Sequence, residues 1–226
     1  DRGWPQVDGA VYAMVPDGQG GWYIGGTFLR VGGLRRSHLA HFRADRTMDD
    51  WAPVADKPVR AMQLVGERLY LGGEFTNVGG VDRGHLAAVD RNTGAVQAWA
   101  PVVAGCVFAL CATQGQLAVG GEFGQIDGME RYSLASFDLA TGRLSDWAPE
   151  LRDNVPRTVS LVRVLKASGD RLFVGGSFVN VDGVARAHVC AFIQDTAELS
   201  EWAPQIPYVV RAIAVGGPGV ILGGDE

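Results

Sequence analysis

Histidine can bind a metal or transfer a proton near neutral pH, and three of the four histidines share one position in a repeated motif. His38, His85 and His188 each precede a short apolar run, and Ser133 stands there in a further copy. A zinc site needs three or four ligands around one ion. Because equivalent positions of separate repeats are held apart, we expect no shared metal and interpret these residues as caps of a hydrogen bond beside a strand.

A set of arginines recurs two residues before this position. Its members are Arg36, Arg83, Arg131 and Arg186. A guanidinium group offers five N–H donors in a fixed plane. Since the arginine is present in every copy, we predict a structural role, in which it pairs with an acidic group or with backbone carbonyls of the neighbouring repeat.

A third set varies between copies and has side chains that suit ligand recognition. It stands early in the first strand of each repeat and comprises Tyr12, Arg60, Phe108, Arg163 and Arg211. Aromatic rings offer flat apolar faces for stacking, and guanidinium groups bind anions through paired hydrogen bonds. We predict that these five residues bind an anionic or carbohydrate ligand near the mouth of a channel. The alternative is that they pack between repeats.

These positions belong to a repeat that is marked by a Gly-Gly pair and a Trp-Ala-Pro triplet. The pairs begin at Gly25, Gly72, Gly120, Gly175 and Gly223, at spacings of 47, 48, 55 and 48 residues. The triplets begin at Trp51, Trp99, Trp147 and Trp202, and Trp4-Pro5 is a degenerate copy. A fixed period of about 40–50 residues is typical of solenoids, propellers and arrays.

Each repeat is predicted to contain four short strands. The first begins at Val11, Val59, Val107, Val162 and Val209, the second leads into the glycine pair, the third follows the His or Ser position, and the fourth ends at the tryptophan. We expect short glycine turns between the first and second strands and close packing or a bulge at the glycine pairs. We expect the four tryptophans to be largely buried and to fill the wedge between neighbouring sheets. Short apolar runs between Gly, Asp and Asn predict strands, and no sustained 3.6-residue apolar period predicts a helix. A longer loop (residues 28–36 in the first copy) joins the second and third strands. The connection into the next repeat is longest at residues 150–160, which include Arg152 and Arg157.

This pattern predicts an all-β fold, a β-propeller of four-stranded antiparallel blades with about 48 residues per blade. We predict a single propeller over residues 1–226, with blades 6–53, 54–101, 102–149 and 150–204 and a partial fifth at 205–226. A β-solenoid is the main alternative, but its repeats are shorter. The fifth blade has only two strands, so we expect self-association, another chain, or residues missing from this chain to complete it.

The composition argues against several classes of protein. Hydrophobic residues make up 47% of the chain, which allows a large core. The net charge of −5 does not suit a general nucleic-acid binder, and no apolar run reaches the about 18 residues of a membrane span. Cys190 stands where other copies have Ala40, Ala87 and Ala135, which predicts a small buried residue rather than a disulfide. Because the chain starts at Asp1 without a signal peptide, we expect a mature or excised piece of a longer protein.

The consensus GGxFxxVxGxxRxxLAxFDxxTGxxxxWAP, taken from residues 72–101 and 120–149, resembles the delta-60 repeat of bacterial proteins. It is also similar to propeller repeats of Rax2-like cell-surface proteins. The resemblance implies a propeller in a large, secreted or surface-attached bacterial protein, with no established catalytic residues. A weaker likeness is to the docking motif A-x-D-x-x-T-G-x-x-x-W of quinoproteins: Ala88, Asp90, Thr93 and Gly94 match its first half, and Trp99 comes one residue late.

Two classes of function follow. We favour a non-enzymatic binding or scaffolding propeller that presents one loop face to a protein or carbohydrate partner, without a cofactor, a metal or catalytic residues. The alternative is a quinoprotein-like or glycan-processing enzyme that uses the central channel. No paired carboxylates converge from several repeats at the strand starts, as glycoside hydrolysis would require.

Overall fold

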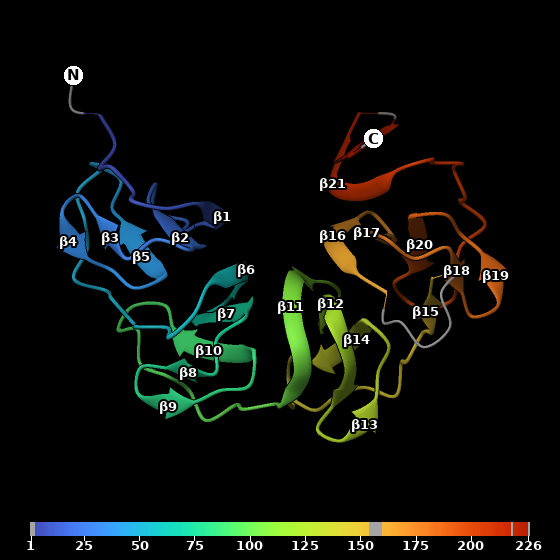
Figure 1. The fold of residues 1–226 in the computed structure, drawn as a ribbon, viewed down its shortest axis with the longest axis horizontal. Coiled ribbons are helices and arrows are strands. Elements are labelled where there is room, and N and C mark those ends of the chain that lie inside the picture. The colour runs from blue at the N-terminus through green and yellow to red at the C-terminus, as the bar shows by residue number, and fades with distance from the viewer. Residues whose placement is uncertain (1–2, 154–159, 218, 226) are drawn as a thin grey trace. The chain divides into compact units, whose positions relative to one another are not determined.

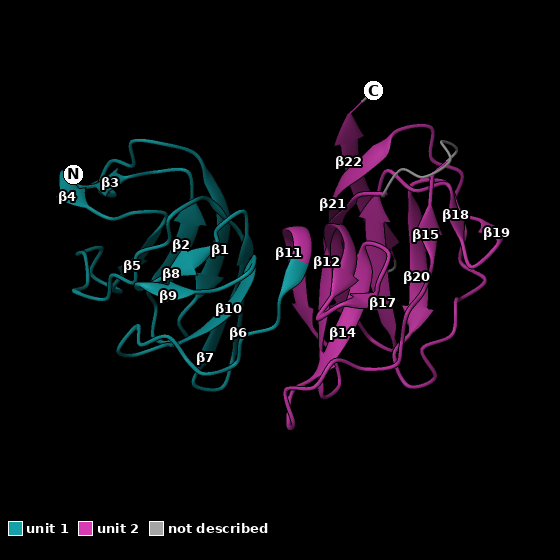
Figure 2. Cartoon of the chain, turned by 60° about the horizontal axis from the view of Figure 1, so that its bottom comes forward, with its two compact units in different colours: residues 1–103 teal, residues 104–226 magenta. Residues whose placement is uncertain are grey.

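The computed structural model describes residues 3–153, 160–217 and 219–225. These residues form strands and turns, and the prediction of an all-β fold is confirmed (Figure 1). Within the described ranges there is no helix that is long and apolar enough to cross a membrane. The chain divides into two compact units, Asp1–Val103 and Ala104–Glu226 (Figure 2).

Each of the first four repeats supplies one main antiparallel sheet, in which the second strand lies between the first and the third, and the described part of the fifth repeat supplies the first two strands. The first strands are β1 (Val11–Pro16), β6 (Val59–Val65), β11 (Val103–Ala112), β16 (Val162–Ser168) and β21 (Val209–Gly216). The second strands are β2 (Trp22–Gly26), β7 (Arg68–Gly73), β12 (Gln116–Ile126), β17 (Arg171–Gly176) and β22 (Gly219–Asp225). The third strands are β5 (Leu39–Phe42), β10 (Leu86–Asp90), β14 (Leu134–Asp138) and β20 (Val189–Ile193). Glycines with positive φ, such as Gly66 (55°) and Gly115 (76°), form the predicted tight turns between first and second strands.

The predicted fourth strand is much shorter than expected. It is reduced to one isolated bridge in each of the first four repeats, for example Val89 to Val96 and Phe137 to Leu144. The chain then reaches the Trp-Ala-Pro triplet, whose proline has no N–H to continue a ladder. The sheets of the first four repeats therefore have three full strands, and the expected fourth strand is a single bridge at the edge.

The loop between the second and third strands contains a small hairpin that the sequence interpretation missed. The hairpins are β3 (Arg30–Val31) with β4 (Leu34–Arg35), β8 (Asn77–Val78) with β9 (Val81–Asp82), the end of β12 with β13 (Met129–Glu130), and β18 (Asn180–Val181) with β19 (Val184–Ala185). In the fourth repeat β18 also pairs with β15 (Leu151–Arg152). The two turn residues of each hairpin have positive φ, such as 59° and 82° at Gly79 and Gly80. These values are those of a type I′ turn.

The glycine pairs mark two close approaches of backbone. A Cβ on the second glycine would lie 1.9 Å from the Ala10 carbonyl oxygen at Gly26 and 1.8 Å from that of Leu161 at Gly176. A Cβ on the first glycine would meet the next sheet, as Gly25 does at 2.8 Å from Val59 Cγ1. Close packing, which the sequence predicted for these pairs, is confirmed.

Apolar side chains fill the space between successive sheets inside each unit. In the first unit Tyr23, Trp51, Leu69 and Leu71 belong to one buried cluster. Trp51 contacts Tyr23 of its own repeat at a ring distance of 5.1 Å, and its Nε1 donates to the Asp90 carbonyl of the next repeat at 3.3 Å. The predicted role of this ring between sheets is confirmed here. The prediction that all four tryptophans are largely buried is not, because Trp99, Trp147 and Trp202 are only half-buried.

Candidate functional site

The five residues predicted to bind a ligand occupy one structural position, which lies beside the glycine pair. In β1, Val11 pairs with Gly26 and Ala13 with Gly25, so Tyr12 is the extra residue of a β-bulge. The same shift in register leaves Arg60, Arg163 and Arg211 as the extra residues of β6, β16 and β21. Gly121 approaches the Cys106 carbonyl and Val107 Cα as Gly26 approaches Ala10 and Val11, which gives Phe108 the same place. A bulge re-aims a side chain and leaves it outside the ladder.

In the first unit the bulge brings Tyr12 and Arg60 together. The Arg60 guanidinium carbon lies 4.1 Å from the centre of the Tyr12 ring, which is a cation–π contact. Arg60 also pairs with Glu74, the residue after the second glycine pair, through Nε at 2.7 Å and Nη2 at 2.5 Å from one carboxylate oxygen. Tyr12 is 44% exposed, so one face of this cluster is open to solvent.

In the second unit the bulge residues separate into two groups. The Arg163 guanidinium carbon lies 5.7 Å from the centre of the Phe108 ring. Arg211 instead forms an ion pair with Asp225, which follows the last glycine pair. The structure thus brings together Tyr12 with Arg60 and Phe108 with Arg163, and it gives Arg211 a carboxylate partner of its own.

The residue after each glycine pair differs between repeats in type and in the group that it binds. These residues are Thr27, Glu74, Glu122, Ser177 and Asp225. The two hydroxyl oxygens accept backbone N–H groups that precede the first strand, Ala10 to Thr27 at 2.9 Å and Leu161 to Ser177 at 3.0 Å. The carboxylates of Glu74 and Asp225 bind guanidinium groups instead. Sequence reasoning missed this position, although its occupation by hydroxyl or acidic residues in every repeat was visible.

The arginines between the second and third strands have the structural role that the sequence predicted. Arg131 is 9% exposed, and it donates to the Glu130 carbonyl at 2.7 Å and the Ser145 carbonyl at 2.8 Å. Arg36, Arg83 and Arg186 bind the corresponding carbonyl pairs. One detail was wrong: the acceptors belong to the same repeat, not to the neighbouring one.

The histidine and serine position is also structural. His38, His85, Ser133 and His188 all have a positive φ of 65° to 68°. At each position the backbone N–H donates to the carbonyl of the phenylalanine that stands two residues after the glycine pair, as His85 does to Phe75 at 3.0 Å. The backbone carbonyl of the same position accepts the N–H of the second glycine. The predicted hydrogen-bond cap is confirmed. No group of three or more His, Cys, Asp or Glu among the described residues is arranged to hold a metal.

The residues that match the first half of the quinoprotein motif form a turn. The Asp90 carboxylate accepts the N–H groups of Asn92 and Thr93 and the Thr93 hydroxyl, at 2.8 to 3.0 Å. Asp138 binds Thr141 in the same way. An aspartate that accepts bonds from the following residues stabilises a tight turn by itself, so these residues have a sufficient structural explanation.

A buried polar cluster in the first repeat was missed by the sequence analysis. His41 Nε2 lies 3.0 Å from Asp17 Oδ2 and His41 Nδ1 lies 3.4 Å from Asp49 Oδ2, beside a small cavity of about 130 Å³. Burial alone would raise the pKa of both aspartates, but hydrogen bonds outweigh it and lower them, chiefly from the Gln19 N–H and the His41 ring to Asp17 and from the Trp51 N–H to Asp49. Because both ring nitrogens face carboxylates, the cluster is suited to cross-linking the sheet. The signal was a histidine in the apolar run Leu39-Ala40-His41-Phe42.

The long connection in the fourth repeat is described only in part. Arg152 pairs with Glu150 and lies 5.2 Å from the centre of the Tyr132 ring. The rest of the predicted insertion, residues 154–159 with Arg157, lies outside the described residues.

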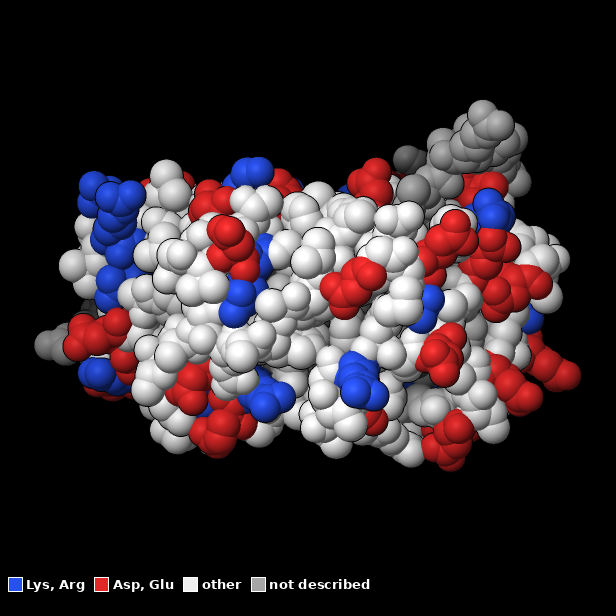
Figure 3. All heavy atoms as spheres, turned by 90° about the horizontal axis from the view of Figure 1, so that it is seen from below, with Lys and Arg blue, Asp and Glu red and all other residues white. Residues whose placement is uncertain are grey.

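Charge is distributed unevenly between the units. The first has 11 basic and 11 acidic residues and the second has 9 and 14, so the net charge of −5 lies in the second. On the face drawn in Figure 3, Lys and Arg are interspersed with Asp and Glu instead of forming one basic patch.

Comparison with protein-family models and with curated proteins gave no match. The fold is similar to the crystal structure of the extracellular domain of BT4673 from B. thetaiotaomicron, with a TM-score of 0.59 and 14% sequence identity. The alignment covers 94% of this chain and 25% of that one, so the chain spans about a quarter of its length. The computationally designed Ika4 protein aligns with a TM-score of 0.49 and 13% identity, over 84% of this chain and 95% of its own. The likeness to BT4673 concerns the fold alone.

Proposed function

We propose that the repeats are blades of a β-propeller and that the chain is a non-enzymatic binding and scaffolding module of a secreted or cell-surface bacterial protein. The module presents the loop end that carries the bulges to a carbohydrate. The observation that carries this proposal is the recurring bulge, because it points a residue of variable type out of the ladder at the same end of every sheet. Function concentrates at such positions when a rigid scaffold holds them.

The propeller is supported by the one-sheet repeat and by the packing of successive sheets within each unit. First strands of adjacent repeats are neighbours, as β1 is to β6 and β16 to β21. The resemblance to delta-60 repeats points the same way. The extracellular location is proposed from the resemblance to delta-60 repeats and to the repeats of Rax2-like cell-surface proteins.

Charge pairing favours a neutral carbohydrate over the anionic ligand that the sequence also allowed. Arg60 and Arg211 are already neutralised by Glu74 and Asp225, so an anion would have to displace a carboxylate. A sugar needs no such exchange: its apolar face stacks on an aromatic ring, and its hydroxyls donate to carboxylates and accept from guanidinium groups. Tyr12, Arg60 and Glu74 provide these three contacts in one partly exposed cluster.

The test is a glycan array followed by calorimetry on the oligosaccharides that bind. The double variant Tyr12→Ala/Arg60→Ala should lose at least tenfold in affinity, since each lost hydrogen bond to a charged group is worth about 1.5–3 kcal/mol. Arg68→Ala is the matched control, because Arg68 is exposed at the other end of the same hairpin. Equal affinity in the wild type and the double variant, or loss in the control alone, would contradict the proposal. Addition of a quinone cofactor and Ca²⁺ tests the enzymatic alternative in the same instrument.

A further inference from the structure

The last sheet lacks, among the described residues, the third strand that occupies one edge of every other main sheet. β22 pairs with β21 on one side, and among the described residues no strand pairs with its other edge. In the four other repeats a third strand occupies this edge, for example β10 beside β7, with Leu86 opposite Gly72 and Val89 opposite Leu69.

Exposure at one equivalent position measures the difference. The residue two places before the glycine pair is Tyr23, Tyr70, Ala118 or Phe173 in the first four repeats, with exposures of 2%, 4%, 1% and 5%. In the fifth it is Ile221, which is 71% exposed. In the first repeat the equivalent Tyr23 packs against Leu69 and Leu71 of the following sheet, so the exposure of Ile221 shows that no following sheet covers this face within the described residues.

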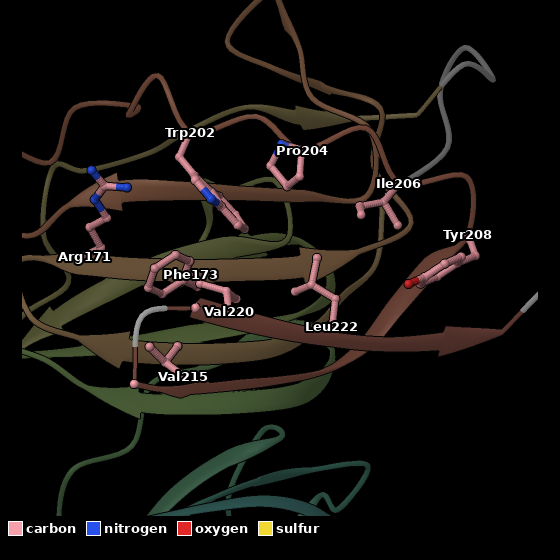
Figure 4. A pocket seen from close by; sticks show the side chains of 11 residues that line it. Arg171, Phe173, Trp202, Pro204, Ile206, Tyr208, Val215, Val220 and Leu222 are labelled. Carbon is pink, nitrogen blue, oxygen red and sulfur yellow. The ribbon is translucent and has the colours of Figure 1, made fainter.

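A groove of about 710 Å³ lies on the opposite face of β22 (Figure 4). Phe173 and Trp202 of the fourth repeat line it together with Val220 and Leu222 of β22. Between the first two repeats, the corresponding space beside Tyr23 and Trp51 is filled by Ala87 and Val89 of the third strand, which are completely buried. The groove is therefore shaped like a site for a third strand.

Trp202 at the groove carries an indole N–H, and equivalent tryptophans donate theirs to a carbonyl of the next repeat. Trp51 Nε1 donates to Asp90 O at 3.3 Å, and Trp147 Nε1 donates to Ala197 O at 3.2 Å. Asp90 is the last residue of β10 and Ala197 lies in the turn after β20, so both carbonyls stand at or beyond the end of the third strand of the next repeat. The turn that would serve Trp202 in this way is not among the described residues.

We propose that this groove is an acceptor site for a β-hairpin with the chemistry of the third and fourth strands of the same repeat. The incoming strand, of the type Leu-Ala-x-Val/Phe-Asp, adds antiparallel to β22. Its leucine lies opposite Gly223, its alanine opposite Leu222 and its valine or phenylalanine opposite Val220, which is the register of β10 on β7. Main-chain hydrogen bonds supply affinity and the apolar pocket supplies specificity. This site is separate from the proposed carbohydrate site, so either can fail alone.

The test uses a labelled synthetic peptide of residues 85–98, which contains the third strand and the turn but no tryptophan. We expect saturable binding to the whole chain by fluorescence anisotropy, and slower amide exchange at β22 when the peptide is bound. A peptide with aspartate in place of Ala87 and Val89 should bind at least tenfold more weakly.

Two protein variants locate the site. Leu222→Asp, in the groove, should weaken binding at least tenfold, and Val184→Asp, on the exposed hairpin β18–β19, should leave it unchanged. Unchanged exchange at β22 in the wild type on peptide addition would overturn the proposal even if Leu222→Asp does not fold. So would a dimer of this chain that protects β22 and excludes the peptide, because a second copy would then be the occupant.

Discussion

Arg131 holds the loop between the second and third strands of its repeat by binding carbonyls on two sides of it. One acceptor is the preceding residue, Glu130, and the other is Ser145, beyond the third strand. Only a planar group with several donors can bind both at once. The recurrence of arginine at this position is thus explained by the pair of backbone carbonyls that the guanidinium binds in each of the four repeats.

Replacement of Arg131 by alanine should destabilise the protein by about 3 kcal/mol, because two hydrogen bonds from a charged donor are lost in a nearly buried site. Urea unfolding followed by fluorescence measures this. Arg143→Ala in the same repeat is the control, since Arg143 is exposed and should change the unfolding free energy by no more than about 0.5 kcal/mol. Equal effects of the two substitutions would show that the carbonyl contacts contribute nothing.

Gly176 tests the close approach at the glycine pair. An alanine Cβ would lie 1.8 Å from the Leu161 carbonyl oxygen, so the bulge in β16 would have to open. We expect Gly176→Ala to cost about 3 kcal/mol or more in unfolding free energy. Gly216→Ala is the matched control, because nothing lies within 4 Å of its added Cβ. A Gly176→Ala protein as stable as this control would refute the steric explanation.

At the level of elements, the sequence predicted the strands better than the loops. Strand starts such as Val59 and Val162 were placed correctly because apolar runs and glycine turns set them locally. The hairpin β8–β9 was missed although Val78-Gly79-Gly80-Val81 has the signal of a type I′ turn. The short fourth strand and the contacts of His41 with Asp17 and Asp49 could not be predicted, because they depend on residues that meet only in the fold.

Asp56 attaches the hairpin β8–β9 to the chain that leads into β6. Its Oδ1 accepts the Thr76 and Asn77 N–H groups at 2.8 and 2.9 Å, and its Oδ2 accepts the Thr76 hydroxyl at 2.7 Å. Burial alone would raise the pKa of Asp56, but these hydrogen bonds outweigh it and hold the pKa below its ordinary value. The ionised carboxylate is therefore the form that fixes the hairpin.

This lowered pKa gives a dependence of stability on pH. Because the folded-state pKa lies below the unfolded value of about 3.9, the stabilisation is present above that value and is lost as the pH falls through the folded-state pKa. The difference in unfolding free energy between wild type and Asp56→Asn should therefore shrink as the pH is lowered from about 6 to about 3. Thr76→Val removes the hydroxyl that donates to the Asp56 carboxylate. It should therefore make the pH dependence of the unfolding free energy smaller without abolishing it. A difference that stays constant with pH would count against the carboxylate contacts.

At the scale of the whole molecule, the propeller proposal requires the first strands of both units to face one channel. Spin labels at position 12 in the first unit and position 163 in the second should then give a narrow distance distribution by pulsed electron resonance. Labels at 60 and 211 provide an independent pair. Broad distributions for both pairs would mean that the two units are not held in one ring, and the propeller would have to be abandoned.

The central claim is that the bulge residues form the binding face, and chemical-shift mapping by NMR tests it most directly. The probe is a neutral oligosaccharide that the glycan array shows to bind. We predict that the largest shift changes, at the amides and side chains around the bulges, include Tyr12, Arg60 and Glu74, and that the turns at Gly66 and Gly115 stay unchanged. Shift changes confined to those turns or to the groove beside Leu222 would contradict the account.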